Sequence, residues 1–325
     1  MKAIRHHRYG APSVLRLEDA AVPSVGPADV LIRVRAASVN PLDWHFIRGE
    51  PYIVRPGNGL LRPADGRVGV DLAGSVEQVG TDVTKFAVGD EVFGCVAGRG
   101  SLAEYVSVPQ DGAVLAKPSG QSFEQAASVP VAAFTALQAL RDHGRLQPGQ
   151  RVLVNGAAGG VGTFTVQIAR ALGAEVTGVC SGRNVELVAS IGASRVIDYA
   201  KEDFTRSDGR YDLLIDIAGS RPFRAYRRVL TPGAMVVGVG GLSRGRVLGP
   251  AARVIKALLL SRLSRQPMSF FIAQPNPADL AVLGDLLATG KVTPVIDRSY
   301  PLSEAPEAIR YLEQGHARGK VVITV

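Results

Sequence analysis

The sequence predicts an α/β protein in which a doubly wound parallel sheet follows a compact β-rich domain. Two observations carry this prediction. From residue 151 to residue 272, six strand-like segments alternate with helical or turn-rich segments, as they do in a doubly wound parallel sheet. Before about residue 122, short strands and turns follow one another without that alternation. A chain of 325 residues is long enough for two domains of ordinary size.

A glycine-rich turn directly follows the first strand of the predicted parallel sheet and indicates what the sheet binds. It reads Asn155-Gly156-Ala157-Ala158-Gly159-Gly160-Val161-Gly162 and joins the strand at 151–154 to a helix whose apolar residues recur at helical spacing. Such a turn brings backbone N–H groups and a helix N-terminus to a pyrophosphate. We therefore expect a dinucleotide to bind at Ala158, Gly159, Gly160 and Val161. Ala157 replaces the first glycine of the usual G-x-G-x-x-G, so the turn alone is a weak signal.

Five more strands follow the glycine turn. They are predicted at 175–180, 195–198, 212–217, 234–239 and 268–272, with a helix at 183–191 after the first of them. This succession favours a dinucleotide-binding Rossmann domain.

The residues after the second strand indicate which dinucleotide binds. An NAD site usually has Asp or Glu there, which accepts hydrogen bonds from the ribose hydroxyls. This chain has Cys180-Ser181-Gly182-Arg183-Asn184 and no acid before Glu186. Ser181 and Arg183 can bind a 2′-phosphate and Tyr199 can close over it, so NADPH is expected rather than NADH. In the alternative interpretation, Arg183 is only an exposed residue at a helix start.

Composition narrows the class of protein. With 46% hydrophobic and 20% charged residues, the chain has the composition of a soluble globular protein. The first residues lack the apolar core of a signal peptide and no segment approaches a membrane span in length, so a cytoplasmic protein is expected. Cys95 and Cys180 are too few for a disulfide framework or a structural zinc site, and each could serve as a small buried residue.

The net charge of +8 is unevenly distributed. Residues 221–265 contain ten Arg or Lys residues and no Asp or Glu. A predicted helix at 250–263 has apolar residues on one side and basic residues on the other, a pattern that could meet an anionic membrane surface or nucleic acid. Such helices more often pack their apolar side on the core. We therefore expect no stable nucleic-acid or membrane partner and leave peripheral membrane contact open.

The remaining segments complete the outline. Residues 30–36 alternate apolar and charged residues, as a half-exposed strand does. A helical region is predicted from 123 to 140, ahead of the glycine turn. After about residue 280, the pattern gives a helix, a strand at 293–296, a helix at 303–313 and a closing strand at 320–325.

Over nearly its full length, the chain resembles the medium-chain dehydrogenase/reductase superfamily, and specifically its zinc-free quinone oxidoreductase branch. The resemblance rests on the order and spacing of seven motifs, each of which is loose by itself. They are Ser38-Val39-Asn40-Pro41-Leu42-Asp43, Gly69-Val70-Asp71-Leu72-Ala73-Gly74, Gly89-Asp90-Glu91-Val92-Phe93-Gly94, Ala103-Glu104-Tyr105, Pro130-Val131-Ala132-Ala133-Phe134-Thr135-Ala136, the turn at 157–162, and Gly315-His316-Ala317-Arg318-Gly319-Lys320-Val321-Val322.

This resemblance implies a Rossmann domain inserted in a β-rich, GroES-like catalytic domain to which both chain ends contribute. We expect the N-terminal part of the catalytic domain at 1–122, the NADPH-binding domain at 123–278, and the return to the catalytic domain at 279–325. The resemblance also implies a homodimer, with an active site in the cleft between the two domains.

The residues at the superfamily's zinc positions predict a site without metal. Where its zinc alcohol dehydrogenases have a first Cys ligand and a His ligand, this chain has Asn40 and Val70, and no Cys occurs at 129–135. With two Cys in all, the sequence also lacks the four-Cys cluster of a structural zinc. Zinc needs Cys, His or carboxylate ligands. Without a Lewis acid, a quinone or an enone is easier to reduce than a simple ketone, because the developing charge is delocalised onto oxygen.

Three residues are candidates for the catalytic work. Asn40 is expected to donate its amide to the substrate carbonyl or to fix the nicotinamide ribose, or else only to form a turn before proline. His45 stands where quinone oxidoreductases often carry Tyr and is a candidate proton donor, although a lone His is more often structural. Tyr52, like Trp44, is expected to line the substrate cleft or to pack against other residues. The segment 51–67 is longer than the resemblance leads us to expect, and it is predicted to shape the substrate mouth.

Further cofactor contacts follow from the resemblance and from the strand ends. Asp43 is expected to hold its loop or to contact the cofactor. Thr135 is expected to bind the nicotinamide end, or to be a buried helix hydroxyl. Lys320 is placed near the cofactor by the Gly-Lys motif, or is a solvated residue at a strand start. The carboxyl ends of the later strands supply Gly219, Gly240, Phe271 and Ile272.

The sequence thus predicts an NADPH-dependent, zinc-independent oxidoreductase that reduces quinones or α,β-unsaturated carbonyls by hydride transfer. The competing hypothesis is a non-enzymatic, NADPH-binding structural or regulatory protein that associates with a membrane surface or RNA through 221–265. Oxidation of NADPH by a quinone favours the first hypothesis. Salt-sensitive binding to polyanions without turnover favours the second.

Overall fold

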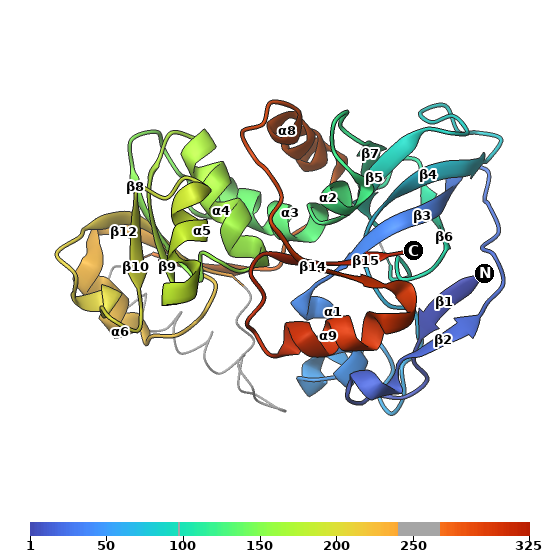
Figure 1. Cartoon of the computed structure of the whole chain (residues 1–325), viewed down its shortest axis with the longest axis horizontal. Coiled ribbons are helices and arrows are strands. Elements are labelled where there is room, and N and C mark those ends of the chain that lie inside the picture. The colour runs from blue at the N-terminus through green and yellow to red at the C-terminus, as the bar shows by residue number, and fades with distance from the viewer. Residues whose placement is uncertain (97, 240–266) are drawn as a thin grey trace. The chain divides into compact units, whose positions relative to one another are not determined.

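The computed structural model describes residues 1–96, 98–239 and 267–325 (Figure 1). The chain forms two compact units. The first unit comprises Met1–Phe134, Pro275–Gly290 and Pro294–Val325, and the second comprises Thr135–Gln274 and Lys291–Thr293. Both chain ends therefore belong to the first unit, and the second unit is inserted between its parts.

A six-stranded parallel sheet forms the centre of the second unit. Its strands are β8 (Arg151–Asn155), β9 (Glu175–Cys180), β10 (Arg195–Asp198), β11 (Tyr211–Asp216), β12 (Leu230–Val239) and β13 (Met268–Phe271). They lie in the order β10-β9-β8-β11-β12-β13, and every neighbouring pair is parallel. The order reverses between β8 and β11, and in such sheets ligands bind at that point, outside the carboxyl ends of the strands. The predicted Rossmann fold is confirmed.

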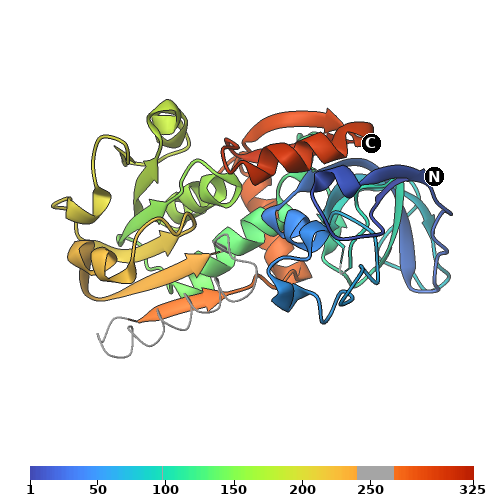
Figure 2. The same ribbon diagram turned by 90° about the horizontal axis from the view of Figure 1, so that it is seen from below.

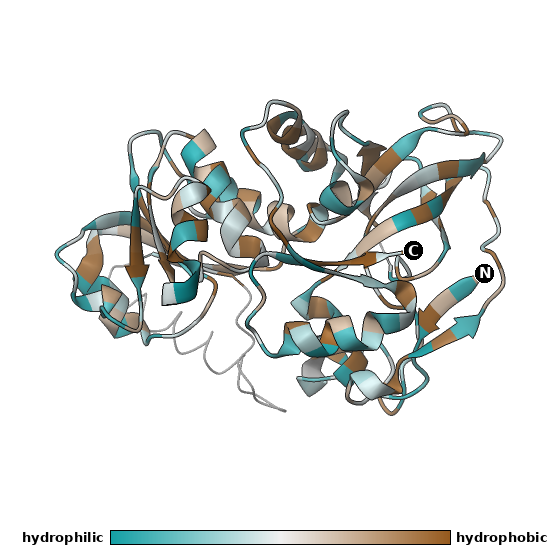
Figure 3. Ribbon diagram, viewed as in Figure 1, coloured by the Kyte–Doolittle hydropathy of each residue, from teal (hydrophilic) through white to brown (hydrophobic). Residues whose placement is uncertain are grey.

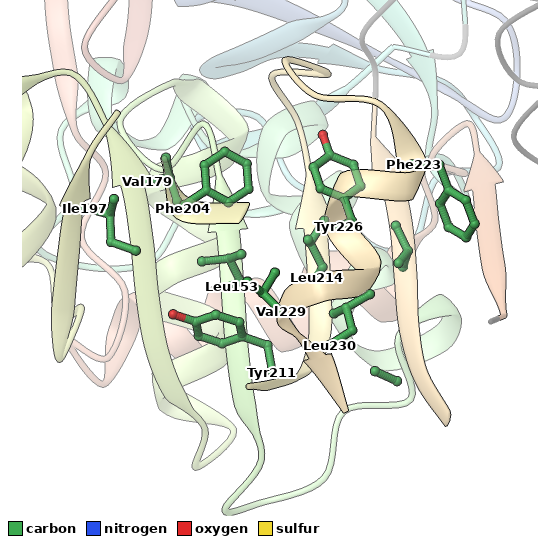
Figure 4. Close-up of a cluster of buried hydrophobic side chains, with 12 residues drawn as sticks. Leu153, Val179, Ile197, Phe204, Tyr211, Leu214, Phe223, Tyr226, Val229 and Leu230 are labelled. Atoms are coloured by element: carbon green, nitrogen blue, oxygen red, sulfur yellow. The ribbon is translucent and has the colours of Figure 1, made fainter. Parts of the chain in front are cut away.

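Apolar side chains on the strands hold this sheet and its helices together. Among the described residues, its helices include α4 (Gly160–Ala171), α5 (Val185–Ser190) and the single turn α6 (Phe223–Tyr226). Figure 4 shows one buried cluster, in which Leu153 and Leu214 from the central strands meet Phe204 and Tyr226. Each of these four side chains is at most 1% exposed. Burial of each is worth roughly 1.5–3 kcal/mol, which fixes the strands that carry the glycine turn.

A second sheet, mostly antiparallel, forms the centre of the first unit. Its strands are β3 (Asp29–Val39), β4 (Asp71–Val79), β5 (Glu91–Cys95), β6 (Tyr105–Pro109), β7 (Val114–Ala116), β14 (Ile296–Pro301) and β15 (Lys320–Thr324). The order is β14-β15-β3-β4-β5-β7, and β6 pairs with β3. Strands β1 (Lys2–Arg5) and β2 (Arg16–Asp19) form a separate antiparallel pair. Because the C-terminal strand β15 pairs with β3, the two ends of the chain build one β-rich domain.

Three helices pack on this sheet: α2 (Phe123–Ala127), α8 (Pro277–Ala288) and α9 (Ala305–Glu313). Helix α1 (Pro41–Arg48) contacts α9, and α3 (Pro130–Gln138) spans the boundary between the two units. Helix α9 lies along β14 and β15 (Figure 2). Its buried residues Ala305, Ala308 and Ile309 recur at helical spacing, and Figure 3 shows the resulting alternation of apolar and polar colours along the helix.

The division between the units differs from the sequence-based boundaries after residues 122 and 278. The structure divides the chain after Phe134 and after Gln274. Helix α2 packs on β3, β4 and β5, and α8 packs on β7, so both helices belong to the first unit. The apolar periodicity of a helix does not state which sheet the helix covers.

The predicted strand at 293–296 is wrong. Strand β14 begins only at Ile296. Thr293 instead bonds to the side chain of Gln167, with its N–H donating to Oε1 at 2.8 Å and its carbonyl accepting from Nε2 at 3.0 Å. Pro294 follows and has no N–H for a ladder.

Some predictions lie outside the described residues. They are the helix at 250–263, Gly240, and the part of the basic stretch from 240 to 265. Within the described ranges, no helix is both long enough and apolar enough to cross a membrane.

Candidate cofactor and catalytic sites

The glycine turn of the second unit is shaped by two close backbone approaches. Gly156 follows β8 with a φ of 98°, a conformation that favours glycine. A Cβ on Gly162 would lie 2.1 Å from the Gly156 carbonyl oxygen. These two glycines therefore let α4 start directly against the strand. Ala157, which stands where the usual pattern has its first glycine, is completely buried.

The N-terminus of α4 is open to a ligand. No side chain caps this 12-residue helix, whose N-cap is Gly159. A Cβ on Gly159 would have no neighbour closer than 3.7 Å, and Gly159, Gly160 and Val161 are only half-buried. Ala158 beside them is 6% exposed. First-turn N–H groups have no partner within a helix, and the helix dipole adds partial positive charge, so the turn fits a pyrophosphate.

The residues expected to bind a 2′-phosphate gather after β9. Tyr199 follows β10, and its N–H donates to the Cys180 carbonyl at 3.0 Å, which places it beside the end of β9. Its side chain is 54% exposed. Ser181 accepts a hydrogen bond at its Oγ from Asn184 Nδ2, 3.1 Å away. Arg183 is exposed, one residue beyond Gly182.

The structure adds a carboxylate that sequence reasoning missed. Asp198 ends β10 and pairs in register with Cys180 at the end of β9. A Cβ on Gly182 would lie 2.7 Å from Asp198 Oδ2, so the carboxylate faces this turn. Its other oxygen accepts from the Ala200 N–H at 3.0 Å. Such a carboxylate repels a phosphate and can accept from a ribose hydroxyl. An acid at the last position of the third strand was the available signal.

The other predicted residues of the second unit occupy varied positions. The N–H of Gly219, just past β11, donates to Asp216 Oδ1 at 2.9 Å, and Tyr226 donates to Oδ2 at 2.8 Å. Phe271 stacks on His143 with the ring centroids 4.1 Å apart, whereas Ile272 is 83% exposed. Thr135 lies half-buried on α3.

In the first unit, Asn40 joins β3 to α1 and is 3% exposed. Its backbone N–H donates to Asp43 Oδ2 at 2.7 Å, which fixes the first turn of α1. Its side-chain Nδ2 donates to Asp71 Oδ2 at 2.8 Å, and its Oδ1 accepts from Lys320 Nζ at 2.6 Å. Asn40 does more than form a turn, because its amide links two charged side chains from distant strands.

Asp71 is the centre of this network. It begins β4 and is completely buried. Its Oδ2 also accepts from Ser38 Oγ at 2.9 Å and lies 3.4 Å from Lys320 Nζ, while its Oδ1 accepts from the Val131 N–H at 3.0 Å. Lys320 is 3% exposed, so the alternative of a solvated lysine at a strand start is wrong. The sequence motif contained Asp71, but nothing in the spacing singled it out as the partner of Asn40 and Lys320.

Asp43 is the second buried carboxyl of the region. It is 1% exposed, and its Oδ1 has no hydrogen-bond partner among the described residues. Burial raises the pKa of Asp43 to about 7, and the charge of Asp71 acts in the same direction. The N–H groups of Asn40 and Gly69 and the ammonium of Lys320 act in the opposite direction. Asp43 is therefore partly protonated near neutral pH.

His45 is held as a structural residue. Its ring is 6% exposed, its Nδ1 lies 2.7 Å from the Glu50 carbonyl oxygen, and its centroid is 3.6 Å from that of half-buried Trp44. Burial lowers the pKa of His45. A neutral imidazole that donates Nδ1–H to a carbonyl has no proton on Nε2 to give, so the geometry favours the structural interpretation.

Tyr52 belongs to a surface cluster built on Arg55. The Arg55 guanidinium lies 4.4 Å from the centroid of Tyr52 and 4.6 Å from that of Tyr9. Arg55 Nε also donates to the Gly49 carbonyl at 2.9 Å. These contacts give the segment 51–67 a defined local structure, in which Tyr52 is 41% exposed.

The residues at the superfamily's zinc positions do not fit a metal. Asn40 uses its amide on Asp71 and Lys320, and Val70 is apolar and 6% exposed. Cys95 pairs with Asp71 across β4 and β5, but burial strongly raises the pKa of its thiol, which disfavours the thiolate that binds zinc. Over the part of the chain that the structure describes, no three His, Cys, Asp or Glu side chains form a group that could hold a metal ion.

Comparison with known proteins shows the family to which the chain belongs. The family model of the alcohol dehydrogenase GroES-like domain matches residues 26–119, and that of zinc-binding dehydrogenases matches residues 191–323. The Mus musculus protein named NAD(P)H oxidoreductase RTN4IP1, mitochondrial, is 35% identical over 98% of this chain and 87% of its own length. The 2-methylene-furan-3-one reductase of Solanum lycopersicum is 34% identical over 99% of this chain and 79% of its own length.

A solved structure extends the similarity to the whole fold. The quinone oxidoreductase from Coxiella burnetii is 34% identical, with a TM-score of 0.88 over 100% of this chain and 99% of that one. The chain therefore belongs to the quinone oxidoreductase branch of the medium-chain dehydrogenase/reductase superfamily and is an oxidoreductase that uses a nicotinamide cofactor.

Proposed function

We propose that the protein is an NADPH-dependent, zinc-independent reductase of quinones or α,β-unsaturated carbonyls. The observation that carries the proposal is the buried network of Asn40, Asp71 and Lys320. The ammonium of Lys320 provides the positive charge that the buried Asp71 carboxylate requires, 3.4 Å away. Asn40, at a superfamily metal position, is already bonded to both. The charge of Asp71 is therefore balanced by Lys320, a side chain of the protein itself.

The choice of substrate class follows from this chemistry. The nicotinamide supplies a hydride, and the protein must stabilise the negative charge that then develops on the substrate oxygen. A quinone or an enone spreads that charge by conjugation and needs less electrophilic help than a simple ketone. The Coxiella burnetii relative is named for a quinone and the Solanum lycopersicum relative for an enone, which supports the same two classes.

Asn40 is the proposed hydrogen-bond donor. A side-chain amide has two N–H groups, and Asp71 takes one from Nδ2. The second N–H can donate to the substrate carbonyl or to the nicotinamide ribose. Because Oδ1 is fixed by Lys320, the amide is held in one orientation before any ligand binds.

The preference for NADPH rests on Ser181 and Arg183 after β9. A guanidinium can bind a 2′-phosphate with two hydrogen bonds, which NADH cannot accept. Asp198 acts against this preference, because its carboxylate faces Gly182 in the same turn. We propose that Arg183 outweighs Asp198, since both the charge and the fork geometry of Arg match a phosphate. A homodimer and a cytoplasmic location stay predictions from the sequence.

Turnover with a small substrate panel tests the proposal. The oxidation of NADPH and of NADH would be followed separately with a benzoquinone, a naphthoquinone, an alkyl enone and a simple aldehyde. Faster turnover of a quinone or the enone, with a higher kcat/KM for NADPH than for NADH, is the expected result. Turnover of the aldehyde alone would contradict the substrate class. Binding of NADPH without any turnover would favour the non-enzymatic hypothesis.

A further inference from the structure

A cavity lies in the first unit, where the end of β1 meets the last residues of the segment 51–67. Its volume is about 760 Å³. It is bounded by the end of β1 and by the segment after Leu61. Its lining residues are Arg5, His6, His7, Arg62, Pro63, Ala64, Asp65, Gly66 and Arg67.

The two walls of this cavity are joined by their backbones. Arg5 and Arg67 form an isolated antiparallel bridge, and the His6 N–H donates to the Gly66 carbonyl at 3.0 Å. A Cβ on Gly66 would lie 2.3 Å from the His6 carbonyl oxygen, so the two segments approach as closely as a glycine permits. The cavity is therefore formed before a ligand arrives, which lowers the entropy lost on binding.

The charges that line the cavity are mostly positive. Arg67 is paired with Asp65, 2.7 Å from one of its oxygens. Although burial opposes it, the hydrogen bonds from Arg67 hold the pKa of Asp65 below its usual value, so this carboxylate is ionised at neutral pH. Burial lowers the pKa of His6, which keeps that ring neutral. His7 is bonded to Glu18 outside the lining, at 3.0 Å.

Two guanidinium groups of the lining, those of Arg5 and Arg62, have no acidic partner among the described residues. Arg5 is half-buried and Arg62 is exposed. In the described ranges, neither side chain makes a hydrogen bond, an ion pair or a ring contact. After the Arg67–Asp65 pair is set aside, the lining has an excess of two positive charges. Two like charges in one concave surface repel each other, and an anion that contacts both would remove that repulsion.

We propose that this cavity binds a phosphate-bearing anion through Arg5 and Arg62. A phosphomonoester or diphosphate has about two negative charges at neutral pH and several acceptor oxygens, so it can take a forked pair of hydrogen bonds from each guanidinium. The site lies at the end of the segment 51–67, uses none of the residues to which the proposed function assigns a hydrogen bond or a cofactor contact, and goes beyond that function.

The phosphate could belong to a soluble ester or to a phospholipid, and the exposed residues Leu60 and Leu61 beside the cavity distinguish the two sources. Their side chains are 68% and 92% exposed and directly precede Arg62 in the chain. A soluble phosphate ester would use the cavity alone. A phospholipid would place its headgroup in the cavity and let the two leucines contact the acyl region.

Calorimetric titration with inorganic pyrophosphate tests the site. Saturating NADPH would be present, so that the glycine turn of the second unit is occupied. Single replacements Arg5→Gln and Arg62→Gln should each weaken binding about tenfold, and the double variant should abolish it. Arg8→Gln, an exposed arginine outside the lining, is the matched control and should bind like the parent. Equal melting temperatures would show that the variants fold.

Vesicle binding separates the two sources. Phosphatidylcholine vesicles with and without phosphatidic acid would be sedimented with the parent chain and with Leu61→Ser. Binding that requires phosphatidic acid, Arg5, Arg62 and Leu61 supports a headgroup, and pyrophosphate binding alone supports a soluble ester. The proposal is overturned if neither probe binds, if the double variant binds as the parent does, or if succinate binds as tightly as pyrophosphate.

Discussion

The first unit and the second unit use their polar groups in opposite ways. In the first, Asn40, Asp71 and Lys320 are all buried and bond to one another. In the second, the N-terminus of α4 has no side-chain cap, and Gly159 leaves space in front of it. The buried network fixes the orientation of one amide, whereas the open turn leaves its donors to a ligand. Buried groups that satisfy one another's hydrogen bonds and exposed groups that leave donors open can thus be distinguished within one chain.

The largest expected effect comes from breaking the buried network. Lys320→Met would leave the Asp71 carboxylate without its cationic partner and should lower the free energy of unfolding by about 3–5 kcal/mol. Urea denaturation measures this change. Lys2→Met is the matched control, because Lys2 and Asp19 form an ion pair whose side chains are 50% and 80% exposed. That change should have little effect on the free energy of unfolding, because water screens an exposed ion pair. Equal effects of the two variants would contradict the assigned role of the network.

Two glycines of the turn give the next comparison. Gly162→Ala would place a Cβ 2.1 Å from the Gly156 carbonyl oxygen, and it should lower the free energy of unfolding by about 2–3 kcal/mol. Gly159→Ala meets nothing within 3.7 Å and should change stability by less than about 0.5 kcal/mol. Its methyl group should still obstruct the phosphates and raise the Kd for NADPH about tenfold. Denaturation and fluorescence titration check both. If Gly159→Ala bound NADPH normally, the turn would not be the pyrophosphate site.

The raised pKa of Asp43 predicts how the stability of the first unit depends on pH. Because burial raises its pKa in the folded chain to about 7, the folded state holds a proton that the unfolded state has released. This contribution to stability is complete below the unfolded pKa and is lost as the pH rises through about 7. The parent chain should therefore lose about 2 kcal/mol more than Asp43→Asn between about pH 5.5 and pH 8.5. Denaturation curves at the two pH values measure the difference, and parallel pH profiles would show that Asp43 ionises normally.

The smallest expected effect comes from replacing Arg183, which should change only the preference between NADPH and NADH. Arg183→Gln should lower kcat/KM for NADPH about tenfold and leave the value for NADH unchanged, because only NADPH has the 2′-phosphate. Arg210→Gln provides a control, since Arg210 bonds to the backbone carbonyls of Asp208 and Gly209. Steady-state kinetics with each cofactor measure the ratio. Equal losses with both cofactors would remove Arg183 from the phosphate site.

The sequence was sufficient for the six strands of the parallel sheet in the second unit, because the alternation of strands and helices is a local pattern. Prediction from local patterns was wrong where a contact with a residue distant in sequence decided the structure. Gln167 bonds to Thr293 and delays β14, and the packing of α2 and α8 moves the unit boundaries. Asp71 and Lys320 are separated by 249 positions, so no spacing rule could pair them. Asp198 reaches Gly182 only because β10 pairs with β9.

The most direct test of the proposed zinc-independent mechanism is to measure turnover after metal has been removed. The protein would be dialysed against a chelator, its zinc content measured, and its oxidation of NADPH by a naphthoquinone compared before and after. The charge-balanced network of Asn40, Asp71 and Lys320 predicts an unchanged kcat/KM in metal-free protein. A loss of turnover that added zinc restores would contradict the proposed zinc-independent mechanism.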